Sequence, residues 1–445
     1  MEDRSIDRKW IKHLLYIIAI ISLLMSINTY FSTDNAFSYI GLIPFSYSAL
    51  LLLFGKYAEI NGPGIITYLI VSFLRYVITP FTIIISQEFC EFYINLEYIN
   101  SAIIFMIIEM VACFLVIRYY KPASDTDFLY YKASSLSFYV FLVIALAIFA
   151  SNPNMTGNFN ILDEGNISNE DFEGISGALT LVWQASLAFM FSELLLKIHN
   201  SNTGFNKLGI SLILCLVYLV ILFTGQSSIS RWYSVVTMSA ALAVLLKLYP
   251  SKKKTIIVSI VAPSVILILA ATIIKNTVVG LNAGSSETIS AIFNSNNMDT
   301  YFAGPVCVNT AIGAKHSLGV NISSFFYDLL NNFPVLGNSI DRSQASVSLF
   351  SKYIMRGDLI LPLVAQSYCW FGGIGIPLFS VLSLIMVKKT DLWYSKTSGS
   401  ISFLIAFLSV WTGLATILNF TIWVSWLYCR VIPAYIVYIL SRQRR

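Results

Sequence analysis

Runs of about twenty apolar residues, the length that crosses a bilayer as an α-helix, follow one another along most of this 445-residue chain. Only 11% of its residues are charged, whereas a typical soluble protein has about 25%. The pattern predicts an all-α polytopic membrane protein. About twelve transmembrane helices are predicted, at 11–29, 36–54, 62–86, 101–120, 133–151, 176–197, 208–224, 229–248, 255–274, 359–387, 398–418 and 421–440.

The basic residues predict how these helices are oriented, since cytoplasmic flanks of membrane proteins are rich in Lys and Arg. If both termini are cytoplasmic, 20 of the 28 basic residues fall on cytoplasmic loops and flanks. The acidic cluster from Asp163 to Glu173 then falls outside. The net charge of +5 reflects these flanks and does not indicate a nucleic-acid partner.

One long segment has no apolar run and divides the chain into three parts. Residues 1–274 hold nine predicted transmembrane helices, residues 275–358 form a large outer loop, and residues 359–445 hold three more predicted helices. Long loops in compact proteins are often functional. This loop carries His316 and several basic residues that run against the charge bias, so we expect it to be the working part.

Two short helices are expected inside the loop, one at 321–330 and one at 343–356. Arg342 lies fourteen residues before Arg356, close to four helical turns, so both are expected on nearly the same stripe. After the loop, prolines and the glycine-rich stretch at 372–375 predict that the tenth span is kinked or broken.

Arginines inside or beside the membrane are candidate anion-binding residues. Arg231 opens the eighth predicted helix, where free helix-start amides and a guanidinium together favour an anion. Arg75 lies in mid-span, where a charge is costly unless it is paired or faces a polar cavity. Two interpretations of Arg75 are open: an ion pair with Glu109 or Glu193, or an anion site. For Arg430, deep in the last span, a structural pairing is expected.

The outer loop adds candidates for catalysis. Arg342 and Arg356 could cradle a phosphate, and His316 could act as a general base because histidine exchanges a proton near neutral pH. Asp358, where the loop meets the tenth span, is the main competing base, and Asp328 and Asp341 are two others. The sequence contains no phosphate-binding glycine loop, nucleotide-sugar motif or zinc pattern, so no cofactor or metal is expected.

Three stretches carry a resemblance to a known family. They are TGQSSISRW at the outer end of the eighth helix, LRYVITP in the third, and RGDLILPLVAQSYCWFGGIG after the loop. In these stretches and in its topology the chain resembles the O-antigen and oligosaccharide repeat-unit polymerases, the Wzy-like proteins of bacterial envelopes, and the related O-antigen ligases.

The resemblance implies a metal-independent glycosyltransferase of the C-type fold in the bacterial inner membrane. Such an enzyme moves a growing glycan from its undecaprenyl pyrophosphate carrier onto a new lipid-linked repeat unit, building O-antigen, capsule or exopolysaccharide. A chain-length regulator and a flippase of the same pathway are the partners it implies. Arg75 and Arg231 match the family's membrane arginines, Arg342 and Arg356 its loop arginines, and His316 the loop histidine of the ligases.

A lipid-linked oligosaccharide flippase or another polytopic transporter is the alternative. Such proteins often consist of related halves, and a flippase is expected to lack a long outer loop. No repeat is visible between the halves of this chain, and the loop at 275–358 is long. Both observations favour the polymerase.

Overall fold

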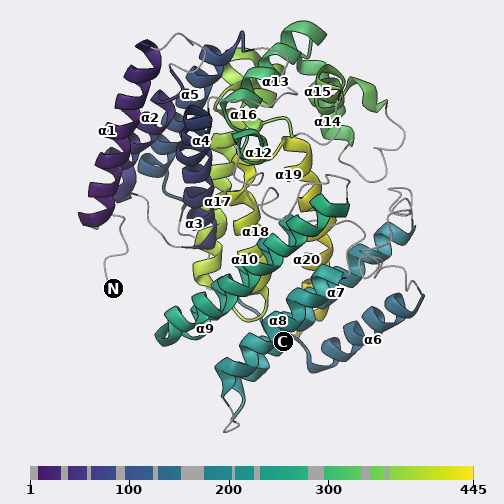
Figure 1. Ribbon diagram of the computed structural model, residues 1–445. Helices are drawn as coiled ribbons and strands as arrows, with labels where there is room; N and C mark the ends of the chain where they lie inside the picture. Colours follow the sequence, from purple (N-terminus) through teal and green to yellow (C-terminus); the bar gives the residue numbers. More distant parts are fainter. Residues whose placement is uncertain are drawn as a thin grey trace. The chain divides into compact units, whose positions relative to one another are not determined.

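The apolar runs of the sequence form helices, and the computed structural model is almost entirely helical (Figure 1). The chain divides into two compact units. Unit 1 comprises Met1–Ala123, Ser290–Lys389 and Trp411–Ser425, and unit 2 comprises Ser124–Ile289, Thr390–Val410 and Trp426–Arg445. The residues that the structure describes are 9–31, 39–57, 62–86, 96–123, 129–151, 175–202, 206–224, 231–278, 295–331, 341–355 and 360–443.

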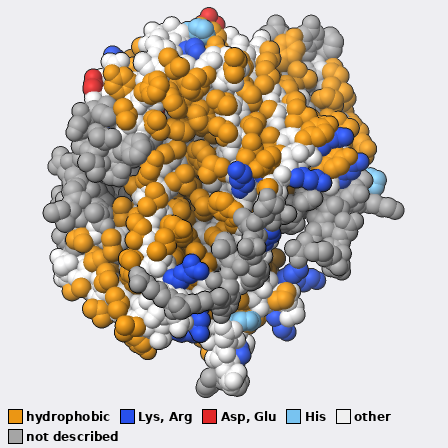
Figure 2. Space-filling view, turned by 180° about the vertical axis from the view of Figure 1, so that it is seen from behind, with side chains coloured by type: hydrophobic (Ala, Val, Ile, Leu, Met, Phe, Trp, Pro, Cys, Tyr) orange, Lys and Arg blue, Asp and Glu red, His pale blue; other side chains and the backbone are white. Residues whose placement is uncertain are grey.

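Several helices have the length and composition of membrane spans. Among the described residues four stretches qualify singly: Pro63–Ser86, Ile99–Tyr119, Leu179–Asn200 and Phe420–Ser441. Two more qualify as bent pairs, Tyr233–Leu248 with Pro250–Ile266 at 114° and Leu363–Gly375 with Leu378–Lys396 at 103°. Hydrophobic side chains cover much of the face seen in Figure 2.

The prediction of an all-α membrane protein is therefore confirmed at the level of four to six candidate spans. The predicted number of about twelve stays a prediction. Other predicted windows hold shorter apolar helices, such as Ser135–Ser151 and Ile401–Gly413, which fall below the length of a full span.

Unit 1 buries a core of aliphatic and aromatic side chains, among them Tyr47, Met106, Val308 and Val364. These residues come from helices that precede the predicted outer loop, from the loop itself and from the helix after it. The elements of unit 1 are α1 (Lys9–Phe31), α2 (Leu42–Phe54), η2 (Gly55–Tyr57), α3 (Pro63–Phe73), the π-helical segment η3 (Leu74–Ile78), α4 (Thr79–Ser86), α5 (Ile99–Tyr119), α12 (Ser295–Tyr301), α13 (Pro305–Leu318), α14 (Ile322–Asn331), η8 (Arg342–Gln344), α15 (Ser346–Ile354), α16 (Leu363–Phe371), η9 (Gly372–Gly375), α17 (Leu378–Lys396) as far as Lys389, η10 (Ala415–Ile417) and α19 (Phe420–Trp426) as far as Ser425.

Unit 2 has its own aromatic core, in which Phe141, Phe189 and Tyr438 pack edge to face. Two short strands pair in parallel, with Leu129 opposite Thr397. The elements of unit 2 are β1 (Leu129–Tyr130), α6 (Ser135–Ser151), α7 (Ile175–Asn200), α8 (Lys207–Thr224), α9 (Arg231–Leu248), η6 (Pro250–Lys252), α10 (Lys253–Val278), β2 (Thr397–Ser398), α18 (Ile401–Gly413) as far as Val410, the π-helical segment η11 (Leu427–Val431) and α20 (Ile432–Ser441).

The described part of the predicted loop is folded into helices. The helix expected at 321–330 is present as α14, and the expected break of the tenth span is present as the 103° bend at η9. Gly372 ends α16 with φ of 65°, a backbone conformation that glycine adopts without the steric cost of a side chain.

The second loop helix differs from the prediction. Arg342 lies in the short turn η8, and the extended backbone of Ala345 separates it from α15. The helix expected at 343–356 thus begins later than predicted, at Ser346, and the expectation that Arg342 lies on the same helical stripe as Arg356 is wrong. The physical reason is tertiary, because the Asp328 carboxylate accepts a hydrogen bond from the Ser346 amide and caps α15 there.

Candidate functional site

Arg75 is fully buried in unit 1 and forms an ion pair with Glu109 of α5. The Arg75 Nη2 atom lies 3.0 Å from Glu109 Oε2, and Arg75 Nη1 donates to Glu109 Oε1 at 3.2 Å. The same carboxylate accepts hydrogen bonds from the hydroxyls of Tyr76 and Ser380. Of the two interpretations left open by the sequence, the ion pair with Glu109 is the one the structure contains. The other candidate partner, Glu193, instead accepts a hydrogen bond from Ser400 in unit 2.

Arg75 also connects distant parts of unit 1. Its Nε donates to the carbonyl of Ala303 at 3.1 Å and its Nη1 to the carbonyl of Thr416 at 2.6 Å. Ala303 belongs to the predicted loop, just before α13, and Thr416 precedes α19. A direct contact between Arg75 and a phosphate would therefore require these protein contacts to rearrange.

Asp299 fixes the start of α13, the helix that carries His316. Its buried carboxylate accepts hydrogen bonds from the amides of Val306 and Cys307 at 3.1 and 2.7 Å, two of the donors that a helix N-terminus leaves free. Burial raises the pKa of Asp299 to about 7, and these two hydrogen bonds oppose the shift. The capped helix then holds His316 in its last turn.

His316 is exposed at the C-terminal end of α13 and stacks on Tyr98, with ring centroids 5.1 Å apart and an angle of 16°. The backbone amide of Tyr98 is itself held by Asn309 of α13, at 2.8 Å. The neighbouring Lys315 donates to the carbonyls of Tyr368 and Cys369 near the end of α16. The imidazole is therefore positioned by stacking and remains open to a substrate.

Asp328 lies in a buried polar network rather than at the surface. It accepts hydrogen bonds from the Ser346 amide and the Trp370 indole, both at 3.1 Å. Gln366 continues the network by donating to the Ser346 hydroxyl and accepting from the amide of Phe420. The network joins α14, α15, α16 and α19. A general base must reach the substrate, so the full burial of Asp328 argues against that role.

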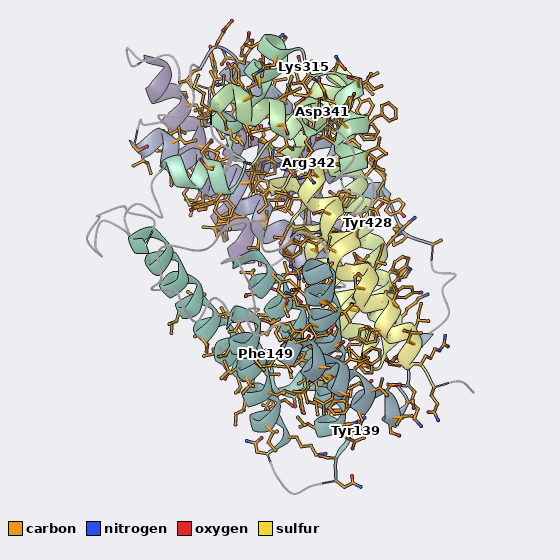
Figure 3. All side chains as sticks on the ribbon, turned by 90° about the vertical axis from the view of Figure 1, so that its right-hand side faces the viewer. Tyr139, Phe149, Lys315, Asp341, Arg342 and Tyr428 are labelled. Atoms are coloured by element: carbon orange, nitrogen blue, oxygen red, sulfur yellow. The ribbon has the colours of Figure 1, made fainter. Side chains whose placement is uncertain are left out.

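The remaining predicted site residues are placed only in part. Arg342 is exposed in η8, beside Asp341 in the segment labelled in Figure 3. Arg231 begins α9 in unit 2, and its side chain lies outside the described residues, as do Arg356 and Asp358 altogether. His316 and Arg342 thus share unit 1 with the buried Arg75.

The pattern of the sequence did not indicate the network around Asp328 and Gln366. A polar residue at 366 inside an apolar run, on a helix expected to be broken, was the available signal. Among the described residues no group of three His, Cys, Asp or Glu side chains is arranged to hold a metal ion.

Comparisons with family models, with curated proteins and with solved structures find no match to this chain.

Proposed function

We propose that this protein is a membrane glycosyltransferase that joins undecaprenyl-pyrophosphate-linked oligosaccharide repeat units into a surface polysaccharide. The proposal places about twelve spans of the C-type fold in a bacterial inner membrane, with both termini in the cytoplasm. The observation that supports it most is the position of His316. The imidazole is exposed at the end of a capped helix in the predicted outer loop, and that helix packs on the apolar helix α5 within one compact unit.

In the proposed reaction, a base removes the proton from a hydroxyl of the acceptor sugar as its oxygen bonds to the anomeric carbon of the donor. The bond from that carbon to the pyrophosphate oxygen breaks, and undecaprenyl pyrophosphate leaves with the bonding electrons. Pyrophosphate is a good leaving group once its charge is neutralised, which fixed guanidinium groups do without a metal. The loop arginines Arg342 and Arg356 would serve this purpose, while Arg75 holds the loop to the membrane helices. Arg231 of unit 2 is a candidate on the sequence alone.

His316 is the base that the described geometry favours. Its ring is held by Tyr98 but its edge is exposed, whereas Asp328 is enclosed by Ser346 and Trp370. General-base assistance contributes about a hundredfold to ten-thousandfold in rate. With purified protein and lipid-linked repeat units, His316→Ala should therefore lower the polymerisation rate at least about a hundredfold. His13→Ala, which removes an exposed histidine of α1, is the matched control.

A near wild-type rate for the His316 variant would end its role as the base. Loss of activity in Asp358→Asn in the same assay would then give the role to Asp358.

Deletion of the gene separates polymerase from flippase. A polymerase is needed only after the repeat units have crossed the membrane, so its loss should leave single lipid-linked units on the outer face. Accumulation on the inner face would contradict the proposal and favour the flippase. Labelling intact cells with a membrane-impermeant sugar-modifying reagent, followed by gel analysis of the lipid-linked glycans, gives the sidedness directly.

A further inference from the structure

Arg430 is a second arginine deep in a span, and its surroundings differ from those of Arg75. It lies in the π-helical segment η11, midway along Phe420–Ser441, with its guanidinium 4.6 Å from the ring centroid of Tyr233 and 5.9 Å from that of Trp426. Its Nη1 atom is buried and has no hydrogen-bond partner among the described residues. The structural pairing expected for Arg430 is thus limited to aromatic rings, whereas Arg75 has a carboxylate.

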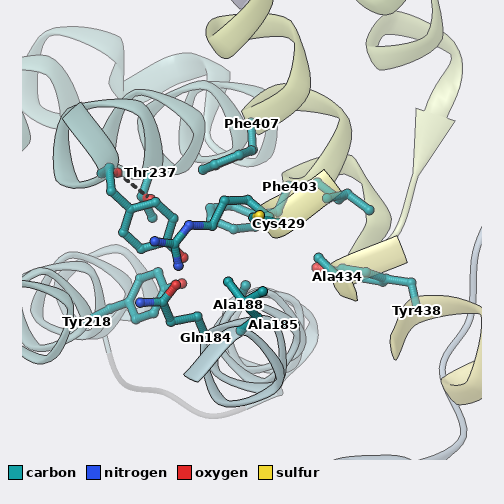
Figure 4. Close-up of a pocket in the computed structure, with 14 residues that line it drawn as sticks. Gln184, Ala185, Ala188, Tyr218, Thr237, Phe403, Phe407, Cys429, Ala434 and Tyr438 are labelled. Carbon is teal, nitrogen blue, oxygen red and sulfur yellow. Dashed lines mark hydrogen bonds between the residues drawn. The ribbon is translucent and has the colours of Figure 1, made fainter. Parts of the chain in front are cut away.

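The guanidinium lines a cavity within unit 2 that contains further unsatisfied polar groups. The hydroxyl of Tyr218 and the Oε1 atom of Gln184 are buried there, each residue only 3% exposed, and neither atom has a hydrogen-bond partner among the described residues. Figure 4 shows both side chains in the cavity wall. The space available to the centres of water-sized molecules is about 20 Å³, within a wider hollow of about 390 Å³ that includes open solvent.

Among the described residues, no Asp or Glu lines this cavity. The other lining residues are mostly apolar; Thr237 donates its hydroxyl proton to the carbonyl of Tyr233, and the Tyr438 hydroxyl bonds to Ser192. The aromatic faces offset only part of the cost of a buried guanidinium. A water molecule could satisfy hydrogen bonds here but could not neutralise the charge.

Three elements present complementary groups to the same space. Arg430 on η11 and Tyr218 on α8 offer N–H and O–H donors, and Gln184 on α7 offers an amide whose oxygen and nitrogen can exchange places by a turn of the side chain. Donors around a fixed positive charge are the arrangement that binds an oxyanion, and guanidinium matches the geometry of phosphate oxygens.

We propose that this cavity of unit 2 binds a phosphate group, held by Arg430, Tyr218 and Gln184. None of the described residues that line this cavity is among those proposed for the polymerase reaction, and the proposal does not depend on that function. The phosphate can belong to a soluble anion or to a membrane lipid, and the two sources are distinguished by experiment.

The test uses the purified full-length protein in a neutral detergent. In one arm inorganic pyrophosphate is titrated in, and binding is followed by tryptophan fluorescence, which Trp426 next to Arg430 should report. In the other arm the protein is placed in nanodiscs of phosphatidylcholine with increasing phosphatidylglycerol, and bound lipid is counted by native mass spectrometry. Binding in the first arm identifies a soluble anion, and retained phosphatidylglycerol in the second identifies a lipid.

Two variants probe the site and two serve as controls. Arg430→Met removes the charge at similar length, and Tyr218→Phe removes only one hydroxyl, so it keeps the test decisive if the first variant folds poorly. Arg118→Met removes an arginine that is also stacked on aromatic rings, and Tyr249→Phe removes a hydroxyl bonded to Ser211 outside the cavity.

We expect Tyr218→Phe to weaken binding at least about tenfold, Arg430→Met to abolish it, and both controls to bind like the wild type. The proposal is overturned if neither probe binds the wild type, or if Tyr218→Phe binds as tightly as Tyr249→Phe. Either result would leave the cavity as a site for water only.

Discussion

Replacing Glu109 with Gln would remove one charge from the buried pair while keeping the size of the side chain. Both partners are 0% exposed, so the charge left on Arg75 could not be compensated by solvent. The glutamine amide would also bring N–H donors towards the hydroxyls of Tyr76 and Ser380, which donate to this carboxylate in the native protein. The substitution therefore removes an ion pair and introduces donor-to-donor contacts.

The expected loss can be estimated from this geometry. Breaking a buried ion pair by removing one partner costs about 3–5 kcal/mol, because it leaves an uncompensated charge. Removing both charges, in Arg75→Met with Glu109→Gln, avoids that penalty. The double variant should therefore recover part of the loss. The recovery is incomplete because the carbonyls of Ala303 and Thr416 still lose the hydrogen bonds that Arg75 donates.

The assay is a double-mutant cycle on the free energy of unfolding, measured by titrating SDS into mixed micelles and following tryptophan fluorescence. We expect a coupling energy of about 2–3 kcal/mol between Arg75 and Glu109. Glu193→Gln is the matched control, since Glu193 accepts a hydrogen bond from Ser400 and forms no ion pair with an arginine among the described residues. It should cost about 1 kcal/mol or less.

Additive effects of the two substitutions would refute the reasoning, because they would show that the pair contributes nothing as a pair. The same variants also separate structure from function. If Arg75 only holds unit 1 together, a double variant that folds should polymerise normally. If it folds and is inactive, the Arg75–Glu109 pair has a role in the proposed reaction beyond stability.

Burial raises the pKa of Asp328 from 3.8 to about 6, so the folded protein holds this proton more tightly than the unfolded chain. The stability that the protonated carboxyl contributes is therefore full below pH 3.8 and is lost as the pH rises through 6. A plot of melting temperature against pH should show this fall for the wild type and not for Asp328→Asn. Gly304→Ala should destabilise the protein by about 1–3 kcal/mol in the SDS titration, because the added Cβ would lie 2.3 Å from the Asp299 carboxylate that caps α13. Gly373→Ala is the control and should not destabilise the protein, since no atom lies within 4 Å of the added Cβ. A membrane-impermeant thiol reagent added outside cells should label a cysteine placed at Ser285 and not one at Ser251, and the reverse result would contradict the predicted orientation.

The helices were largely predictable from the sequence. The windows at 62–86 and 101–120 match Pro63–Ser86 and Ile99–Tyr119 closely, because long apolar runs are a local signal. The glycines at 372–375 likewise marked the bend before α17. Such features depend on neighbouring residues alone.

The partners of buried polar groups were not predictable in the same way. Glu109 was one of two candidate partners for Arg75. Which carboxylate meets the arginine depends on how α5 is rotated against η3, and the packing of these two segments, whose paired residues lie 34 positions apart, decides it. The helical stripe through Arg342 failed for a related reason. A carboxylate from another helix, Asp328, determined where α15 begins, and counting residues along the chain could not show it.

Arg75 and Arg430, the two arginines deep in candidate spans, share a backbone feature. Arg75 lies in η3 and Arg430 in η11, and a proline, Pro80 or Pro433, follows each segment closely. In both cases the residue just before the proline donates its amide to the carbonyl five positions back, at Leu74 or at Leu427. Proline has no amide hydrogen, so a carbonyl in the preceding turn loses its usual donor.

Wide turns of this kind are rare, and they occur often at functional sites. The local sequence thus produces the same type of backbone twice, once in each unit. At Arg75 the chain supplies a carboxylate for the arginine, from Glu109. At Arg430 it supplies a cavity with the unsatisfied groups of Gln184 and Tyr218. This contrast supports a structural role for Arg75, whose charge is paired within the protein, and the proposed binding of an external anion by Arg430.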